Sequence, residues 1–231
     1  MALVDQIHEL AARSATDLNA IHNFVEHSTL VWRTFRLWVE QGNEFEAMNV
    51  ETGSKVSAQD LLSLSDHYKN EYLLTLTFQH HVTSFEAFIF DFLRLVLTDE
   101  PRHLSQKRQI DVGTALSASD RSALVQILVD KELNDLKYEK VTEWCEYMNR
   151  MISLRCPSEI EIGQIAEIKA SRDILVHNSG IANQIYMDKA GSYARHRLGG
   201  KIDIPGPYHT ESWRIIKKVI NDITSAAIAR L

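Results

Sequence analysis

The segment KASRDILVHNSG, residues 169–180, places an arginine and a histidine five positions apart in an otherwise apolar run. Arg172 supplies a permanent cation, and the imidazole of His177 exchanges a proton near neutral pH. Asp173 lies four residues before His177, so on a helix their side chains are neighbours, and a contact would fix the imidazole tautomer. The alternative is that both cations are stabilised by the end of the helix dipole, with Asp173 and His177 as an ordinary surface pair.

Arg172 falls on the same helical stripe as Ile165 and Ile168, which are typical core residues. A guanidinium buried there without compensation would be strongly destabilising, so the sequence predicts a carboxylate partner or a solvated pocket. Glu86, inside an apolar segment, is the candidate partner that would orient the guanidinium; the alternative is a partly exposed carboxylate. Because five helical residues turn through roughly 500°, Arg172 and His177 converge only if the arginine reaches across or a second chain supplies the complement.

Long segments with helical periodicity must position these residues, because proline and glycine are scarce and fall mostly between such segments. The first helix is expected over Leu3–Val39, followed by a loop to about Gln59. A helix of about 33 residues, roughly 50 Å long, comes next and is ended by Pro101. This segment is apolar on much of its circumference, so it is expected at the centre of the fold.

The motif helix is expected over residues 158–179, opened by a capping box at Ser158–Glu161 and closed by Gly180 as the residue after the cap. We predict one all-α domain over residues 1–231, with an N-terminal helix and loop (1–60) and a core bundle (61–231). The remaining expected elements are a capping box at Ser117, a β-hairpin turn at Gly199–Gly200 and a C-terminal helix over about His209–Ala229.

The charge distribution is uneven along the chain. A formal net charge of −6 argues against a general nucleic-acid-binding protein. Residues 191–231 nevertheless carry seven Lys or Arg against three Asp or Glu, and Arg102, Lys107 and Arg108 form a second small basic patch. A local basic surface of this kind attracts a polyanion or is simply a solvated face.

Cys145 and Cys156 have no metal-site or disulfide spacing, so they are expected to be buried thiols in a reducing compartment. The N-terminus has no basic leader, and the most apolar stretch, FEAFIFDFLRLVL, is too short to span a membrane. We therefore expect a cytoplasmic protein without a membrane contact. His80 and His81 lack the spacing of metal ligands and are expected to be core or interface histidines, so neither a metal nor a cofactor is predicted.

The segment EIKASRDILVHNSGIANQIY resembles the signature of HEPN-domain proteins (higher eukaryotes and prokaryotes nucleotide-binding), in which four to six residues separate an arginine from a histidine. Arg172, Asp173 and His177 match this motif at the four-residue spacing. The wider stretch resembles the prokaryotic RiboL-PSP-type branch, as does VTSFEAFIFDFLRLVL with Glu86. The resemblance covers about residues 70–230 and is specific over about 165–186.

The resemblance implies an all-α fold and a homodimer that places two Arg/His pairs in one cleft. It also implies metal-independent endoribonuclease activity on RNA, often in toxins or defence effectors that an antitoxin or another partner restrains. Arg172 and His177 would be catalytic, with Asp173, Glu86 and Asn178 in support. Asn178 would donate to a phosphate or merely cap the helix.

Small residues at Gly163, Ala166 and Ala170 form a stripe that is a candidate for the close approach of the second chain. Ser179 stands where some toxin members of the family carry a tyrosine that a partner nucleotidyltransferase modifies, so this mode of control is not expected. Some family members only bind or scaffold. The alternative for this chain is therefore a non-catalytic module that binds nucleotide, RNA or a regulatory partner.

Overall fold

The computed structural model describes residues 2–43, 47–106 and 109–231. Within these ranges the fold is all-α, as predicted, and its one sheet consists of two strands of two residues each. The α-helices are α1 Leu3–Glu40, α2 Ala58–His67, α3 Leu74–Asp99, α4 Val112–Ser117, α5 Arg121–Leu136, α6 Val141–Ile152, α7 Glu159–His177, α8 Gln184–Ala190 and α9 Gly206–Ile228.

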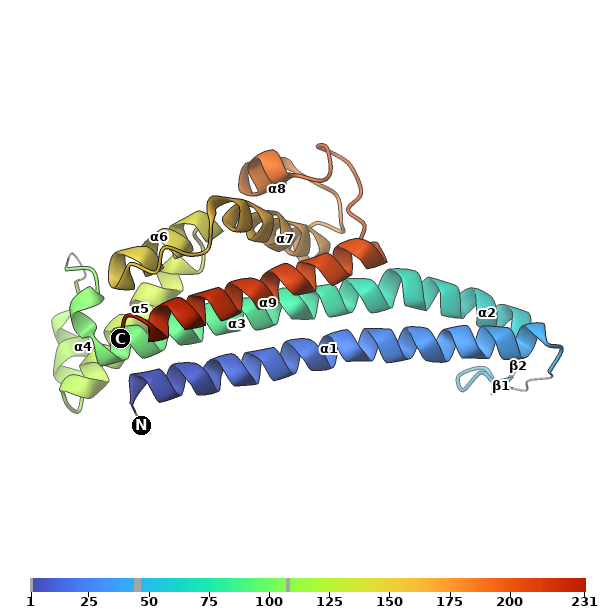
Figure 1. The fold of residues 1–231 in the computed structure, drawn as a ribbon, viewed down its shortest axis with the longest axis horizontal. Coiled ribbons are helices and arrows are strands. Elements are labelled where there is room, and N and C mark those ends of the chain that lie inside the picture. The colour runs from blue at the N-terminus through green and yellow to red at the C-terminus, as the bar shows by residue number, and fades with distance from the viewer. Residues whose placement is uncertain (1, 44–46, 107–108) are drawn as a thin grey trace.

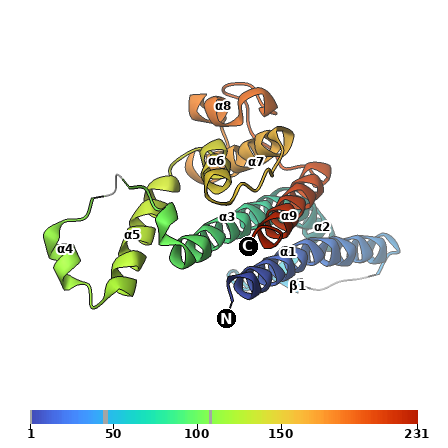
Figure 2. The ribbon, with the colours of Figure 1, turned by 60° about the vertical axis from the view of Figure 1, so that its left-hand side comes forward.

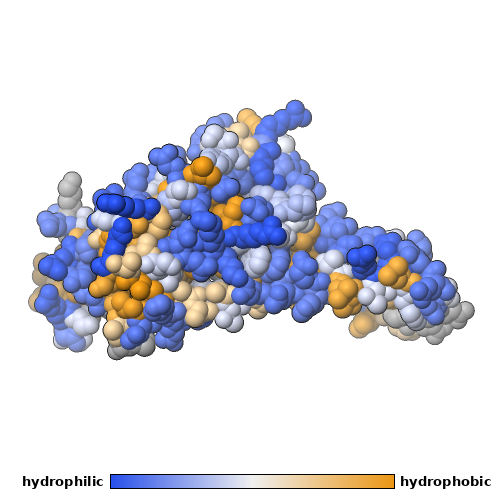
Figure 3. Space-filling model, in the orientation of Figure 1, coloured by the Kyte–Doolittle hydropathy of each residue, from blue (hydrophilic) through white to orange (hydrophobic). Residues whose placement is uncertain are grey.

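Two long antiparallel helices, α1 and α3, form the base of the molecule, and α9 lies along α3 (Figure 1). The inner face of α1 is the one that its periodicity predicts, and among its described residues burial ends at Val25. The rest of α1, together with α2, forms an arm that extends beyond the bundle (Figure 1). Its apolar side chains include the exposed Leu30 and Val31. Figure 3 shows apolar patches on the surface of this arm. The buried residues of α1 are Ile7, Leu10, Ser14, Leu18, Ile21 and Val25.

The central helix is longer than predicted. It begins at Ala58, because the Ser57 side chain accepts a hydrogen bond from the backbone N–H of Asp60 and caps the helix. A π-helical segment, Tyr68–Leu73, then joins α2 to α3. The expected end before Pro101 is confirmed, since α3 stops at Asp99.

The motif helix α7 packs against α3, α6, α8 and α9. Ile165 and Ile168 are almost completely buried in the core, together with Trp144 and Met148 of α6. The indole N–H of Trp144 donates to the carbonyl oxygen of Leu136 at 2.7 Å, which ties α6 to the end of α5. This packing fixes the rotation of α7 and therefore the direction in which its polar residues point.

A histidine pair is buried where α3 meets α9. His81 is 0% exposed, and within the described residues neither of its ring nitrogens has a hydrogen-bond partner. Its ring centroid lies 4.9 Å from that of His209, whose Nε2 is 2.9 Å from the Thr77 hydroxyl. Burial is the main cause that lowers the pKa of His81 to about 3 and the pKa of His209 to about 4. His81 is therefore a core histidine, as predicted, but an unsatisfied one.

The predicted hairpin around Gly199–Gly200 is wrong. Gly199 adopts a positive φ of 78° in a turn, but the chain after it pairs with residues 180–182 instead of folding back on residues 194–198. The backbone N–H groups of Arg195 and His196 donate to the Tyr186 hydroxyl, so they do not pair with residues after the turn. The short sheet lies elsewhere, between β1 (Ala47–Met48) and β2 (Lys55–Val56), in the segment that the sequence predicted as a loop.

Of the predicted helix caps, the one at Ser158 is confirmed, whereas those at Ser117 and Gly180 differ in position from the prediction. Both hydrogen bonds of the capping box at Ser158 are present. Ser117 instead ends α4, and α5 is capped by the Asp120 carboxylate, which accepts the N–H of Ala123. α7 ends at His177 with Ser179 already in the left-handed region at φ 52°, so Gly180 comes one position later than predicted.

Helices α4 and α5 extend sideways from the bundle, as Figure 2 shows. The segment that connects them to α3 contains the predicted basic patch of Arg102, Lys107 and Arg108. Lys107 and Arg108 lie outside the residues that the structure describes. Arg102 forms an ion pair with Glu100. In the described ranges we find no helix with the length and apolar character needed to cross a membrane.

Candidate functional site

A hollow of about 590 Å³ opens where α3, the end of α5, α7 and α8 meet, and it contains four of the five predicted site residues. Glu86 reaches it from α3, whereas Arg172, Asp173 and His177 reach it from α7. We call this hollow the α7 pocket. It is lined by Thr83, Glu86, Ala87, Phe90, Asp91, Arg94, Lys137, Tyr138, Lys169, Arg172, Asp173, His177 and Lys189.

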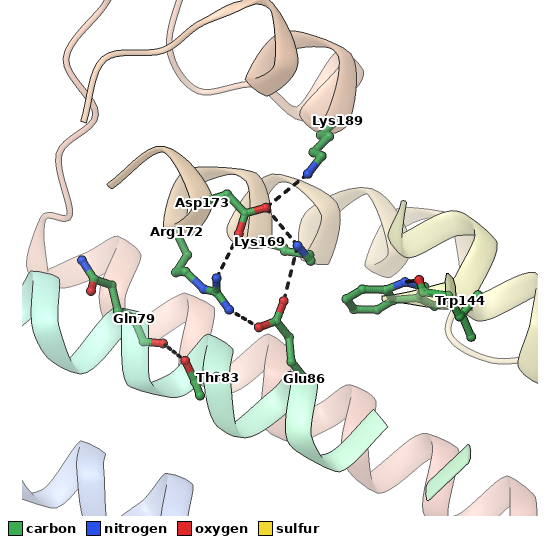
Figure 4. Close-up of polar contacts among 9 residues, drawn as sticks. Gln79, Thr83, Glu86, Trp144, Lys169, Arg172, Asp173 and Lys189 are labelled. Atoms are coloured by element: carbon green, nitrogen blue, oxygen red, sulfur yellow. Dashed lines mark hydrogen bonds and ion pairs between the residues drawn. The ribbon is translucent and has the colours of Figure 1, made fainter. Parts of the chain in front are cut away.

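Arg172 is held between two carboxylates. One terminal nitrogen donates to Glu86, and the other donates to Asp173 at 3.1 Å (Figure 4). Its side chain is 17% exposed, and Glu86 is 20% exposed, so both lie at the wall of the pocket and not in a dry core. The sequence predicted a carboxylate partner or a solvated pocket for this guanidinium, and the structure provides both.

Two lysines complete the cluster, and neither is among the site residues that the sequence predicts. Lys169 lies 2.9 Å from Asp173 and 3.3 Å from Glu86, and its ammonium lies 5.4 Å from the centroid of the Trp144 ring. Lys189, from α8, lies 3.3 Å from Asp173. Lys169 was detectable in the sequence as an i, i+4 partner of Asp173, but the approach of Lys189 depends on how α8 packs.

The cluster has an excess of positive charge. Three cations, Lys169, Arg172 and Lys189, surround two carboxylates, Glu86 and Asp173. Burial acts to raise the pKa of Asp173, but the charge and hydrogen bond of Lys169 and the charges of Lys189 and Arg172 outweigh it and hold the pKa below its ordinary value. Three cations against two carboxylates leave a formal excess of one positive charge at the wall of the pocket, which favours an anionic ligand.

His177 lies at the exposed end of α7 and lines the pocket. The contact with Asp173 that the i, i+4 spacing allows does not form. One carboxylate oxygen of Asp173 accepts hydrogen bonds from Lys169 and Lys189, and the other accepts from Arg172. Within the described residues no hydrogen bond or ion pair engages the imidazole, so it is accessible to a ligand.

Asn178 does not line the pocket. It is the C-cap residue of α7, and its side-chain amide donates to the carbonyl oxygen of Ile181. Of the two roles that the sequence left open for Asn178, the structure shows the one in which it closes the helix.

Glu167, which precedes the motif, organises the segment that follows it. Its buried carboxylate accepts hydrogen bonds from Ser171 (2.7 Å), Tyr186 (3.1 Å), Tyr208 (2.6 Å) and the Nε of Arg195 (3.1 Å). The Arg195 guanidinium also lies 3.3 Å from the centroid of the Tyr208 ring. This network attaches the chain around α8 to α7 and α9, and α8 carries Lys189 into the pocket.

The stripe of small residues on α7 is not open to a second chain at its first position. A Cβ placed on Gly163 would overlap the ring of Tyr193, so the chain's own tyrosine occupies this space. Ala170 is buried in the core. The sequence analysis expected the backbone of a second chain at Gly163, whereas the group that approaches this glycine is a side chain of the same chain.

Comparison of the chain with models of protein families, with curated proteins and with solved structures gives no match. The function therefore has to be inferred from the geometry of the α7 pocket and from the residue motif within it.

Proposed function

We propose that this protein is an endoribonuclease of the HEPN type that cleaves RNA without a metal ion, with Arg172 and His177 as its catalytic residues. The observation that carries the proposal is their common pocket: a guanidinium anchored by Glu86 and an exposed imidazole line one cation-rich hollow. An arginine stabilises charge on phosphate oxygens, and a histidine transfers protons near neutral pH, which are the two functions that RNA cleavage needs.

In the proposed reaction, the ribose 2′-oxygen attacks the adjacent phosphorus, and its proton passes to an imidazole. The bond between phosphorus and the 5′-oxygen breaks as that oxygen takes up a proton from an acid. The products are a 2′,3′-cyclic phosphate and a 5′-hydroxyl. Arg172 stabilises the charge on the phosphorane oxygens, and Lys169 and Lys189 add to the positive potential around it.

A homodimer is part of this proposal, because one imidazole cannot easily act as base and acid in the same step. A second copy would supply the other histidine across the open mouth of the pocket, since Tyr193 already covers the stripe at Gly163. Light scattering at micromolar concentration should therefore give about twice the 26.4 kDa of the chain. A monomer under these conditions would contradict the composite site.

The activity itself is tested by incubating the protein with single-stranded RNA in EDTA. We expect cleavage that leaves 2′,3′-cyclic phosphate ends, and we expect resistance at any position where the substrate carries a 2′-deoxy sugar. The Arg172→Ala variant should be inactive, because it lacks the cation at the phosphate. Intact RNA with the wild-type protein, or equal cleavage by the variant, would contradict the proposal.

A second candidate function is a non-catalytic module that binds RNA or a nucleotide in the same pocket. It is favoured by one observation: both terminal nitrogens of Arg172 already donate to carboxylates, which compensates much of its charge. Binding without cleavage in the same assay would support it.

A role as a toxin or defence effector restrained by an antitoxin rests on the resemblance alone, and relief of growth inhibition by Arg172→Ala would support that role.

A further inference from the structure

We propose that the α7 pocket binds single-stranded RNA, with an unpaired base stacked on Tyr138 while the adjoining phosphates contact the pocket lysines. This inference rests on the proposed function and names the form of its substrate. Tyr138 lines the pocket and yet is 89% exposed, so its ring borders the hollow without being packed in the core.

The ring of Tyr138 is presented by a fixed turn between α5 and α6. The N–H of Tyr138 donates to the carbonyl oxygen of Asp135 at 3.2 Å, and the N–H of Glu139 donates to that of Leu136 at 3.0 Å. The Leu136 carbonyl also accepts the indole N–H of Trp144, so the turn is anchored to α6. Because the backbone of the turn is held in this way, only the side-chain torsions of Tyr138 have to be fixed when a base stacks on its ring.

The charges around this platform suit a nucleic-acid backbone. Five cations line the pocket against three carboxylates, although the whole chain is acidic. Lys137, directly before Tyr138, lies 5.4 Å from the centroid of the Phe90 ring at the pocket wall. The lining cations are Arg94, Lys137, Lys169, Arg172 and Lys189, and the carboxylates are Glu86, Asp91 and Asp173.

An exposed aromatic ring beside cations is how proteins hold single strands, because every base has a face that can stack and every linkage carries a charge. In a duplex the base faces are covered by their neighbours, and unstacking one base is unfavourable. The hollow of about 590 Å³ is of the size that holds a small ligand and not a double helix. The pocket therefore favours an unpaired nucleotide.

The test is the affinity of the full chain for a fluorescent RNA octamer with 2′-O-methyl sugars, which 2′-OH attack cannot cleave, measured by anisotropy. Tyr138→Ala should weaken binding about 5- to 150-fold, and Tyr138→Phe should bind as the wild type does. Lys137→Ala should weaken binding and should make the slope of log affinity against log salt concentration shallower by the amount that about one phosphate contact contributes. Tyr68→Ala, at an exposed tyrosine of the π-helical segment outside the pocket, is the matched control and should have no effect.

Equal affinity of wild type and Tyr138→Ala, or equal affinity for the octamer annealed to its complement, would overturn the inference. These outcomes are distinct from a failure of the nuclease proposal. A wild-type protein that binds the octamer through Tyr138 but leaves ordinary RNA intact supports the platform and contradicts the nuclease. A protein that binds no RNA contradicts both.

Discussion

Replacing His177 by alanine should lower kcat for RNA cleavage by about 10²- to 10⁴-fold, which is the usual contribution of a positioned acid or base. KM should change little, because the imidazole transfers a proton in the transition state and contributes little to substrate binding in the ground state. The values of kcat and kcat/KM should therefore fall together. The thermal midpoint should stay the same, since the side chain lies exposed at the end of α7. The measurement is a steady-state rate on a short single-stranded RNA, with the midpoint recorded for each variant.

The matched control is His8→Ala, because His8 is an exposed histidine on α1 and does not line the pocket. This variant should cleave at the wild-type rate. If His177→Ala retained more than about a tenth of the activity, a general acid–base role for this imidazole would be ruled out. The pocket would then have to act through its cations alone.

Lowering the pH from 7.5 to 5 should reduce the free energy of unfolding by about 3 to 4 kcal/mol through His81 and His209. Both histidines have a folded-state pKa far below the ordinary value of 6.5, about 3 for His81 and about 4 for His209. Between pH 6.5 and these values the unfolded chain binds more protons than the folded chain, so stability falls as the pH falls. Urea unfolding at several pH values measures this slope.

His81→Leu should remove about half of the pH dependence. It should not destabilise the protein at pH 7.5, because no hydrogen bond to His81 is lost within the described residues. His80→Gln is the control on the same helix: its side chain is exposed to solvent, so the slope should remain. A His81→Leu variant with the wild-type slope would show that the buried imidazole does not titrate as its burial predicts.

Much of the fold followed from local patterns. The buried face of α1 and the end of the central helix before Pro101 were predicted, because a 3.6-residue period and a proline act within one or two turns. The capping box at Ser158 was predicted for the same reason, since both of its hydrogen bonds join residues three apart.

The site could be predicted only in part. A guanidinium in line with core isoleucines had to have a compensating group, and Glu86 was the carboxylate in the apolar helix, so this pair could be anticipated. Asp173 could not be assigned correctly from spacing. Several cations can reach the Asp173 carboxylate besides His177, its neighbour on the helix. In the structure this carboxylate pairs with Lys169, Arg172 and Lys189, and Lys189 belongs to a different helix, α8.

The sequence by itself determined that the chain is helical, where its motif helix begins, and that Arg172 must be compensated. The first two properties depend on residues within a few helical turns of one another. The third depends on the free-energy cost of burying an uncompensated guanidinium, which is high in any fold. Only the tertiary structure decided that Tyr193 fills the space beside Gly163, that the chain after Gly199 pairs with residues 180–182, and that Tyr138 stands at the rim of the pocket. Each of these outcomes depends on which of several groups, far apart in the sequence, packs at a given position. A local sequence pattern contains no information on that choice.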